Sequence, residues 1–163
     1  MSSAPLSRLI NSLQSLDYTR KRMESLYQNK RIKVRDLHAM YEALFLRGVT
    51  SFEVFLEELF ISIITQKATY KKGRISVRMT AISRQALMDI LLQGDRYMVW
   101  LPFSQTEARA KIYLREGKPF SELTDADKSM IRTVTTIRNA IAHRSRHATN
   151  EFKRTVRARP ERS

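Results

Sequence analysis

The side chains best suited to chemistry in this chain are Arg138 and His143, with Asn139 directly after the arginine, in the stretch Arg-Asn-Ala-Ile-Ala-His. An imidazole can accept or donate a proton near neutral pH, and a guanidinium can hold a phosphate and stabilise the charge that develops on it. These properties match RNA cleavage in which a 2′-hydroxyl attacks its own phosphodiester, a reaction that requires no metal ion. The same residues also allow a structural interpretation. Cations are favoured near the C-terminus of a helix by the helix dipole, and alanines there are good helix formers.

The helix that must position these residues is the best marked in the sequence. Thr124 and Asp127 form a capping-box pattern, and acidic residues suit the first turn of a helix. Apolar residues then recur at helical spacing and predict a core stripe made of Met130, Val134, Ile137 and Ile141. At about 100° per residue, Asn139 and His143 fall together on the opposite side, with Arg138 about 140° from His143. This polar group must therefore face solvent, a groove or another subunit.

The composition predicts an all-α fold. The chain has 163 residues with only four Gly and four Pro, and 42% of its residues are hydrophobic, which suits one domain with a sizeable core. We predict a small up-and-down helical bundle of about four to five main helices, with a single domain over residues 1–150 and a frayed basic tail over 151–163. The expected helices cover residues 5–28, 34–66, 83–93, 104–116 and 124–143.

Three local features of these elements carry expectations of their own. Gly48 interrupts the second helix at a cost of about 1 kcal/mol relative to Ala, which a close helix crossing, a kink or chance would explain. Ser104 with Glu107 predicts a capped start for the fourth helix. The aromatic connector over residues 97–103 is interpreted as a lid on the core rather than a platform for stacking bases.

Positive charge is the strongest global signal. The net charge is +14 and the pI about 10.5, which favours a polyanionic partner and nucleic acid before a membrane surface. The alternative is a protein that is basic without such a partner. The charge lies in blocks at residues 1–35, 61–88 and 144–163, and the second block includes a basic loop expected between the second and third helices. The candidate RNA-binding residues are Lys71, Lys72, Arg74, Arg78, Arg144 and Arg146.

Several classes of site and location are disfavoured by what the sequence lacks. The absence of cysteine excludes disulfides, thiolate catalysis and zinc-thiolate sites. No acidic cluster with a histidine at ligand spacing is present, so we expect no metal and no cofactor. The N-terminus has no charged-then-apolar signal layout, and no apolar run approaches 18 residues. We therefore expect a cytoplasmic protein with no membrane partner.

The spacing of Arg138, Asn139 and His143 resembles the signature of the HEPN-domain ribonucleases. The similarity extends over roughly residues 35–150, and it is to the HEPN branch associated with RiboL-PSP proteins. The segments that carry it are Arg47–Glu53 before the aromatic helix, Trp100-Leu101-Pro102, Gly117-Lys118-Pro119-Phe120 and Ile137–Ser145. The six-residue motif alone is weakly specific, and its place at the end of the last main helix of a basic helical protein strengthens it.

This resemblance implies a dimer in which two copies of the motif meet in a cleft. It assigns Arg138 and His143 to catalysis and Asn139 to a supporting polar role, and members of the family often act as toxins or defence effectors against RNA. In HEPN toxins that are neutralised by nucleotidyl transfer, a tyrosine stands two residues after the histidine. Ser145 occupies that position here, so an antitoxin would act differently or be absent.

Three hypotheses of different class follow. The first is a metal-independent endoribonuclease that leaves a 2′,3′-cyclic phosphate, has its active site at a homodimer interface and is controlled by an antitoxin protein. The second is a non-catalytic RNA-binding or protein-interaction HEPN module. The third, motivated by charge alone, is a DNA-binding regulator, and it ranks last because no helix-turn-helix spacing is present.

Overall fold

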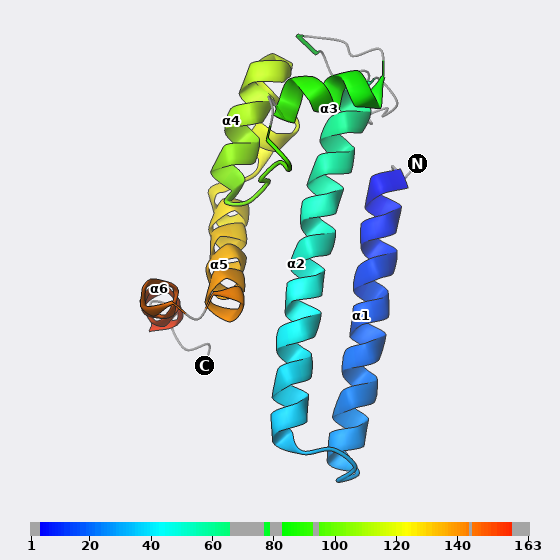
Figure 1. Ribbon diagram of the computed structural model, residues 1–163, viewed down its shortest axis with the longest axis vertical. Coiled ribbons are helices and arrows are strands. Elements are labelled where there is room, and N and C mark those ends of the chain that lie inside the picture. The colour runs from blue at the N-terminus through cyan, green and yellow to red at the C-terminus, as the bar shows by residue number, and fades with distance from the viewer. Residues whose placement is uncertain (1–3, 66–76, 79–82, 93–94, 144, 158–163) are drawn as a thin grey trace. The chain divides into compact units, whose positions relative to one another are not determined.

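The protein is an all-α helical bundle, as predicted from its composition. A computed structural model describes residues 4–65, 77–78, 83–92, 95–143 and 145–157 (Figure 1). The six α-helices of the described residues are α1 (Ala4–Gln28), α2 (Val34–Ile64), α3 (Arg84–Leu92), α4 (Phe103–Tyr113), α5 (Asp125–Ala142) and α6 (Arg146–Arg157). Two short 3₁₀ turns, η1 (Arg115–Gly117) and η2 (Phe120–Glu122), join α4 to α5. The five predicted helices are confirmed to within a few residues at each end.

The sixth helix departs from the prediction. Residues 151–157, which we expected to belong to a frayed tail, continue α6 from Arg146, and this helix brings the number of helices above the expected four to five. Residues 158–163 and nearly all of the basic loop between α2 and α3 lie outside the described residues.

The contacts within the chain group it into two compact units, which are described separately. Unit 1 contains Met1–Arg8 and Glu53–Ile131, and unit 2 contains Leu9–Phe52 and Arg132–Ser163. The prediction of one domain over residues 1–150 stays a prediction.

Unit 1 is built around the ring of Phe60, which is fully buried. The Phe60 ring centroid lies 5.4 Å from that of Trp100, 6.1 Å from that of Tyr113 and 5.8 Å from that of Phe120, in tilted or edge-on geometries. Such arrangements are the preferred ones for aromatic pairs. The four rings come from α2, the connector before α4, the end of α4 and η2, so this cluster holds the elements of unit 1 together.

The connector over residues 97–103 is confirmed as a lid on this core for two of its three rings. Trp100 and Phe103 are buried, whereas Tyr97 is 76% exposed. The indole Nε1–H of Trp100 donates to Glu57 Oε2 at 3.2 Å, and the Arg109 guanidinium lies 4.8 Å from the centroid of the indole ring. Burial against this ring lowers the pKa of Arg109.

The start of α4 differs from the prediction. Its N-cap is Pro102, which makes no side-chain capping bond, so the expected cap by Ser104 with Glu107 is wrong. The Glu107 carboxylate instead accepts a hydrogen bond from Lys128 Nζ at 3.2 Å, and Lys111 Nζ lies 3.4 Å away. These partners lower the pKa of Glu107, the bond from Lys128 most of all. The carboxylate therefore ties α4 to the first turns of α5.

In unit 2, α1 and α2 form an antiparallel hairpin (Figure 1). Ser12 and Ser51 share a hydrogen bond of 2.8 Å between their hydroxyls, and Tyr41 donates its hydroxyl hydrogen to Glu24. Residue 12 pairs with residue 51 and residue 24 with residue 41, so the residue numbers rise along α1 as they fall along α2, as antiparallel packing requires. Helix α2 continues without a break through Gly48. A Cβ built at this glycine would lie 3.7 Å from Leu16 Cδ1 and 3.9 Å from Leu13 Cδ2, which is ordinary van der Waals contact.

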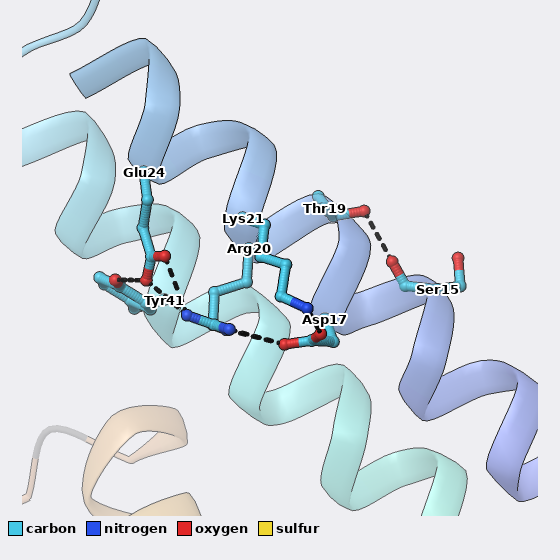
Figure 2. A network of polar contacts seen from close by, with 7 residues as sticks. All are labelled: Ser15, Asp17, Thr19, Arg20, Lys21, Glu24 and Tyr41. Carbon is cyan, nitrogen blue, oxygen red and sulfur yellow. Dashed lines mark hydrogen bonds and ion pairs between the residues drawn. The ribbon is translucent and has the colours of Figure 1, made fainter. Parts of the chain in front are cut away.

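A polar network on the hairpin centres on Arg20 (Figure 2). Its guanidinium donates to Asp17 Oδ1 at 2.7 and 3.0 Å and to the Glu24 carboxylate at 2.7 and 2.9 Å. Lys21 Nζ lies 2.8 Å from Asp17 Oδ2. Hydrogen bonds from Lys21 and then Arg20 lower the pKa of Asp17, and hydrogen bonds from Tyr41 and then Arg20 lower the pKa of Glu24. The network lies along α1 and is joined to α2 through the hydrogen bond from the Tyr41 hydroxyl to the Glu24 carboxylate.

We predict that Gly48→Ala stabilises the protein by up to about 1 kcal/mol, because alanine restricts the unfolded chain and favours the helix. The space for its methyl group is already present against Leu13 and Leu16. The measurement is the free energy of unfolding from urea titration, followed by circular dichroism at the helix band.

Gly117→Ala is the matched control and should destabilise the protein. Gly117 has a φ of +71°, and a Cβ there would lie 3.0 Å from Lys111 Cγ, so alanine is strained at this position. A lower free energy of unfolding for Gly48→Ala would show that α1 and α2 pack more tightly at Gly48 than this geometry indicates.

The hairpin network predicts a pH dependence of stability. Because the folded protein lowers the pKa of Glu24 below its ordinary 4.5, the stabilisation is fully present above that pH and is lost as the pH falls through the lowered pKa. Glu24→Gln should therefore lower the melting temperature at pH 7, and the difference from the parent protein should shrink steadily below pH 4.5. Thermal melts over a pH series measure it, and a difference that is independent of pH would contradict the assignment.

Candidate functional site

The first turn of α5 has the reciprocal capping box that the sequence predicted. The Thr124 N–H donates to Asp127 Oδ2 at 3.1 Å, and the Asp127 N–H donates to Thr124 Oγ1 at 3.2 Å. The Thr124 hydroxyl also donates to Asp127 Oδ2 at 2.6 Å. These bonds lower the pKa of Asp127. The cap fixes the residue at which α5 begins, and the helical pitch then fixes the direction of every later side chain.

The buried side of α5 is not the predicted one along its whole length. Met130 is 63% exposed, so its place in the predicted core stripe is wrong, and Val134, Ile137 and Ile141 are half-buried. Thr135 is the most deeply buried residue of the helix, at 8% exposed. It lies about 140° around the helix from Met130, so the helix turns a more polar side inward than its apolar periodicity indicates.

Arg138 and Asn139 are in direct contact. Arg138 Nη1 donates to Asn139 Oδ1 at 3.1 Å, and both side chains are half-buried. We expected the Arg138 side chain to be able to swing toward His143, and the structure shows it held by its neighbour instead. The amide oxygen of Asn139 therefore restrains the guanidinium, which has further N–H donors that suit a phosphate.

His143 lies at the end of α5, directly after its last residue, Ala142. Its backbone N–H donates to Asn139 O at 2.9 Å, and its side chain is exposed. Within the described part of the chain, no hydrogen bond joins the His143 imidazole to another side chain. The structure thus brings together Arg138 and Asn139 of the predicted trio, and it presents His143 separately at the helix end.

Ser145 has a structural role that sequence reasoning missed. Its hydroxyl oxygen accepts a hydrogen bond from the Ala148 N–H at 3.2 Å, which is a side-chain cap on the first turn of α6. Ser145 is therefore a helix cap in this chain. A serine three residues before Ala148, in front of an amphipathic stretch, was the available sequence signal for α6.

The α6 helix has two different sides. Ala148 is buried at 9% exposure, and Phe152 and Thr155 are half-buried. The exposed side carries positive or titratable groups from Arg146, His147, Lys153 and Arg154. Arg154 Nη1 donates to Glu151 Oε1 at 3.0 Å. Lys153 and Arg154 were not among the predicted RNA-binding residues.

The predicted RNA-binding residues divide into two groups. Arg78 and Arg146 are described, and both are exposed. Arg78 belongs to unit 1, where its N–H donates to Tyr113 O at 2.9 Å next to an isolated bridge between Val77 and Leu114. Lys71, Lys72, Arg74 and Arg144 lie outside the described residues.

Two further observations concern metals and membranes. Among the residues that the structure describes, no group of three or more His, Asp or Glu side chains is placed to hold a metal ion. In the same part of the chain, no helix combines the length and the apolar character that crossing a bilayer demands.

The Thr124 cap predicts a measurable loss when it is removed. Thr124→Ala should lower the free energy of unfolding by about 1 kcal/mol, because the Asp127 N–H loses its side-chain acceptor. Thr124→Ser is the matched control and should retain most of the stability, since it keeps the hydroxyl. Urea titration of both variants checks this, and equal losses for Ala and Ser would show that the methyl group rather than the cap stabilises the helix.

Comparisons of the chain with protein-family models, with curated proteins and with solved structures find no match. A function must therefore be argued from the side chains and the geometry of this chain.

Proposed function

We propose that the protein is a metal-independent endoribonuclease of the HEPN type, which cleaves RNA at a site formed between two copies of the chain. His143 is the general acid and base, Arg138 holds the scissile phosphate, and Asn139 orients Arg138. The observation that carries the proposal is the combination of an Arg138 guanidinium restrained by Asn139, at 3.1 Å, with the exposed imidazole of His143 at the end of the same helix.

The reaction that these groups suit is an internal transesterification. The His143 imidazole takes the proton of the 2′-hydroxyl, and the 2′-oxygen forms a bond to phosphorus. The bond from phosphorus to the 5′-oxygen of the next nucleotide breaks, and that oxygen receives the proton that His143 took, so the imidazole returns to its starting form. The products are a 2′,3′-cyclic phosphate and a 5′-hydroxyl, and the guanidinium stabilises the extra negative charge on the phosphate oxygens.

In this proposal, a second copy of the chain supplies the second catalytic group of each active site. Arg138 and His143 lie about 140° apart around the helix axis, and the Arg138 guanidinium is bonded to Asn139. In a two-fold dimer, a phosphate between two α5 helices would meet Arg138 from one copy and His143 from the other. The partners of the protein are then RNA, a second copy of the chain and an antitoxin protein that restrains it.

One observation favours a second function. The Arg138 guanidinium already has a hydrogen-bond partner within its own chain, whereas the His143 imidazole has none within the described residues. A restrained guanidinium is a good phosphate clamp even without proton transfer. The second candidate is therefore an RNA-binding or protein-interaction module in which Arg138 and Asn139 bind and His143 does no chemistry.

The test is cleavage of total RNA by the purified protein in the presence of EDTA. We expect fragments that end in 2′,3′-cyclic phosphate, and we expect His143→Ala to lower the rate by about 10²–10⁴-fold, the range that a general acid or base contributes. Arg138→Ala should also lower the rate, and Arg138→Lys should recover only part of it because lysine lacks the planar fork.

His38→Ala is the matched control, since His38 is an exposed histidine of α2, and it should cleave as fast as the parent protein. Equal cleavage by His143→Ala and by the parent protein would remove His143 from the mechanism. Tight RNA binding without any cleavage, weakened by Arg138→Ala, would support the second candidate.

A further inference from the structure

We propose that the exposed side of α6 binds the backbone phosphates of the RNA next to the scissile one. This inference rests on the proposed function for the place of the scissile phosphate, at His143. The α6 surface is defined here as the exposed cations Arg146, Lys153 and Arg154. It supplies affinity for any RNA sequence and takes no part in proton transfer.

The cations of the α6 surface share one side of the helix. At about 100° per residue they fall within an arc of about 100°, and Arg146 and Lys153 are separated by about 10 Å along the axis. Arg154 has a side-chain exposure of 79%. A row of exposed cations along a helix is the electrostatic footprint of a surface that follows a phosphate backbone.

The chain itself places this surface beside the candidate catalytic histidine. His143 and Arg146 are three positions apart in the chain, so their Cα atoms lie at most about 11 Å apart. The Ser145 cap fixes the start of α6 within this short span. A strand whose phosphate lies at His143 would therefore pass the first turn of α6.

RNA fits this surface better than an anionic membrane does. Helices that lie on a membrane insert an exposed apolar side into the lipid. On the inner side of α6, Ala148 is buried and Phe152 and Thr155 are half-buried, so these residues are partly covered by the protein. The exposed side carries charge and hydrogen-bond donors, which suit phosphate oxygens.

Glu151 reduces the positive charge of the α6 surface. Its carboxylate accepts the hydrogen bond from Arg154 Nη1 at 3.0 Å, which neutralises part of the positive charge and directs the guanidinium along the helix. Removal of this acid should strengthen RNA binding, and no general loss of structure would produce that direction of change.

The test measures binding of a fluorescently labelled single-stranded RNA by anisotropy, with every protein carrying His143→Ala so that the RNA is not cut. The triple variant Arg146→Ala, Lys153→Ala, Arg154→Ala should raise Kd at least about tenfold at about 0.1 M salt. The slope of log affinity against log salt should become shallower by about 2, since each phosphate that the protein no longer neutralises reduces it by about 0.7. Glu151→Gln should lower Kd.

The matched control removes three exposed cations from elsewhere in unit 2, with Arg22→Ala, Arg31→Ala and Arg35→Ala in one protein. We expect its Kd to rise less than about threefold. Equal losses in the two triple variants would overturn the inference, because net charge alone would then explain both. If the triple variant does not fold, the single variant Lys153→Gln replaces it, and its circular dichroism spectrum should match that of the parent protein. An unchanged Kd for Lys153→Gln would also contradict the inference.

The outcomes separate this inference from the proposed function. If the parent protein cleaves RNA and the α6 substitutions leave the Kd for RNA unchanged, this inference is overturned and the proposed function is not. Loss of binding in the α6 variant, when the parent protein cleaves no RNA, would overturn the proposed function and support α6 as an RNA-binding surface. If the α6 variant retains RNA binding and loses binding to phosphatidylserine vesicles, α6 is assigned to membranes and the inference is overturned.

Discussion

The register of α5 is the constraint on which the candidate site depends. The reciprocal bonds between Thr124 and Asp127 set where the helix begins, and the bond of 3.2 Å from Lys128 to Glu107 holds its first turns to α4. From that first residue, the helical pitch determines the direction of each later side chain. Asn139 and His143 lie about 40° apart, and Arg138 lies about 140° from His143. In the proposed active site, one phosphate therefore meets Arg138 from one copy of the chain and His143 from a second copy.

The two units are stabilised by different kinds of interaction. Unit 1 depends on buried rings around Phe60, and the polar atoms at its edge, such as the Trp100 N–H and the Glu57 carboxylate, are bonded to one another. In the hairpin of unit 2, the Tyr41 hydroxyl of α2 donates to Glu24 of α1, and Glu24 belongs to the charged network around Arg20. Aromatic burial does not depend on pH, whereas the hairpin network does.

The parts of the structure that the sequence predicted are those decided by near neighbours. The Thr124 cap needed only residues three apart, and the helix ranges followed from periodicity and the scarcity of Gly and Pro. Predictions failed where a distant partner decided the outcome. Glu107 bonds to Lys128 rather than capping its own helix, and Met130 is exposed because tertiary packing, not periodicity, selects the buried side of α5.

The identities of the site residues came from the sequence, but their contacts did not. The bond between Arg138 and Asn139 joins adjacent side chains whose rotamers no spacing rule specifies. The role of Ser145 as the cap of α6 follows from the hydrogen bond that its hydroxyl oxygen accepts from the Ala148 N–H. The cap also explains why residues 151–157 are helical rather than frayed.

A mixing experiment tests most directly the claim that one active site is shared between two chains. Arg138→Ala and His143→Ala proteins, each inactive alone, are combined under conditions that exchange subunits, and RNA cleavage is measured. The account predicts partial recovery of cleavage, because a mixed dimer has one site with an intact Arg138 from one chain and an intact His143 from the other. Mixed dimers that form and yet cleave no RNA, while the parent protein does, would contradict it.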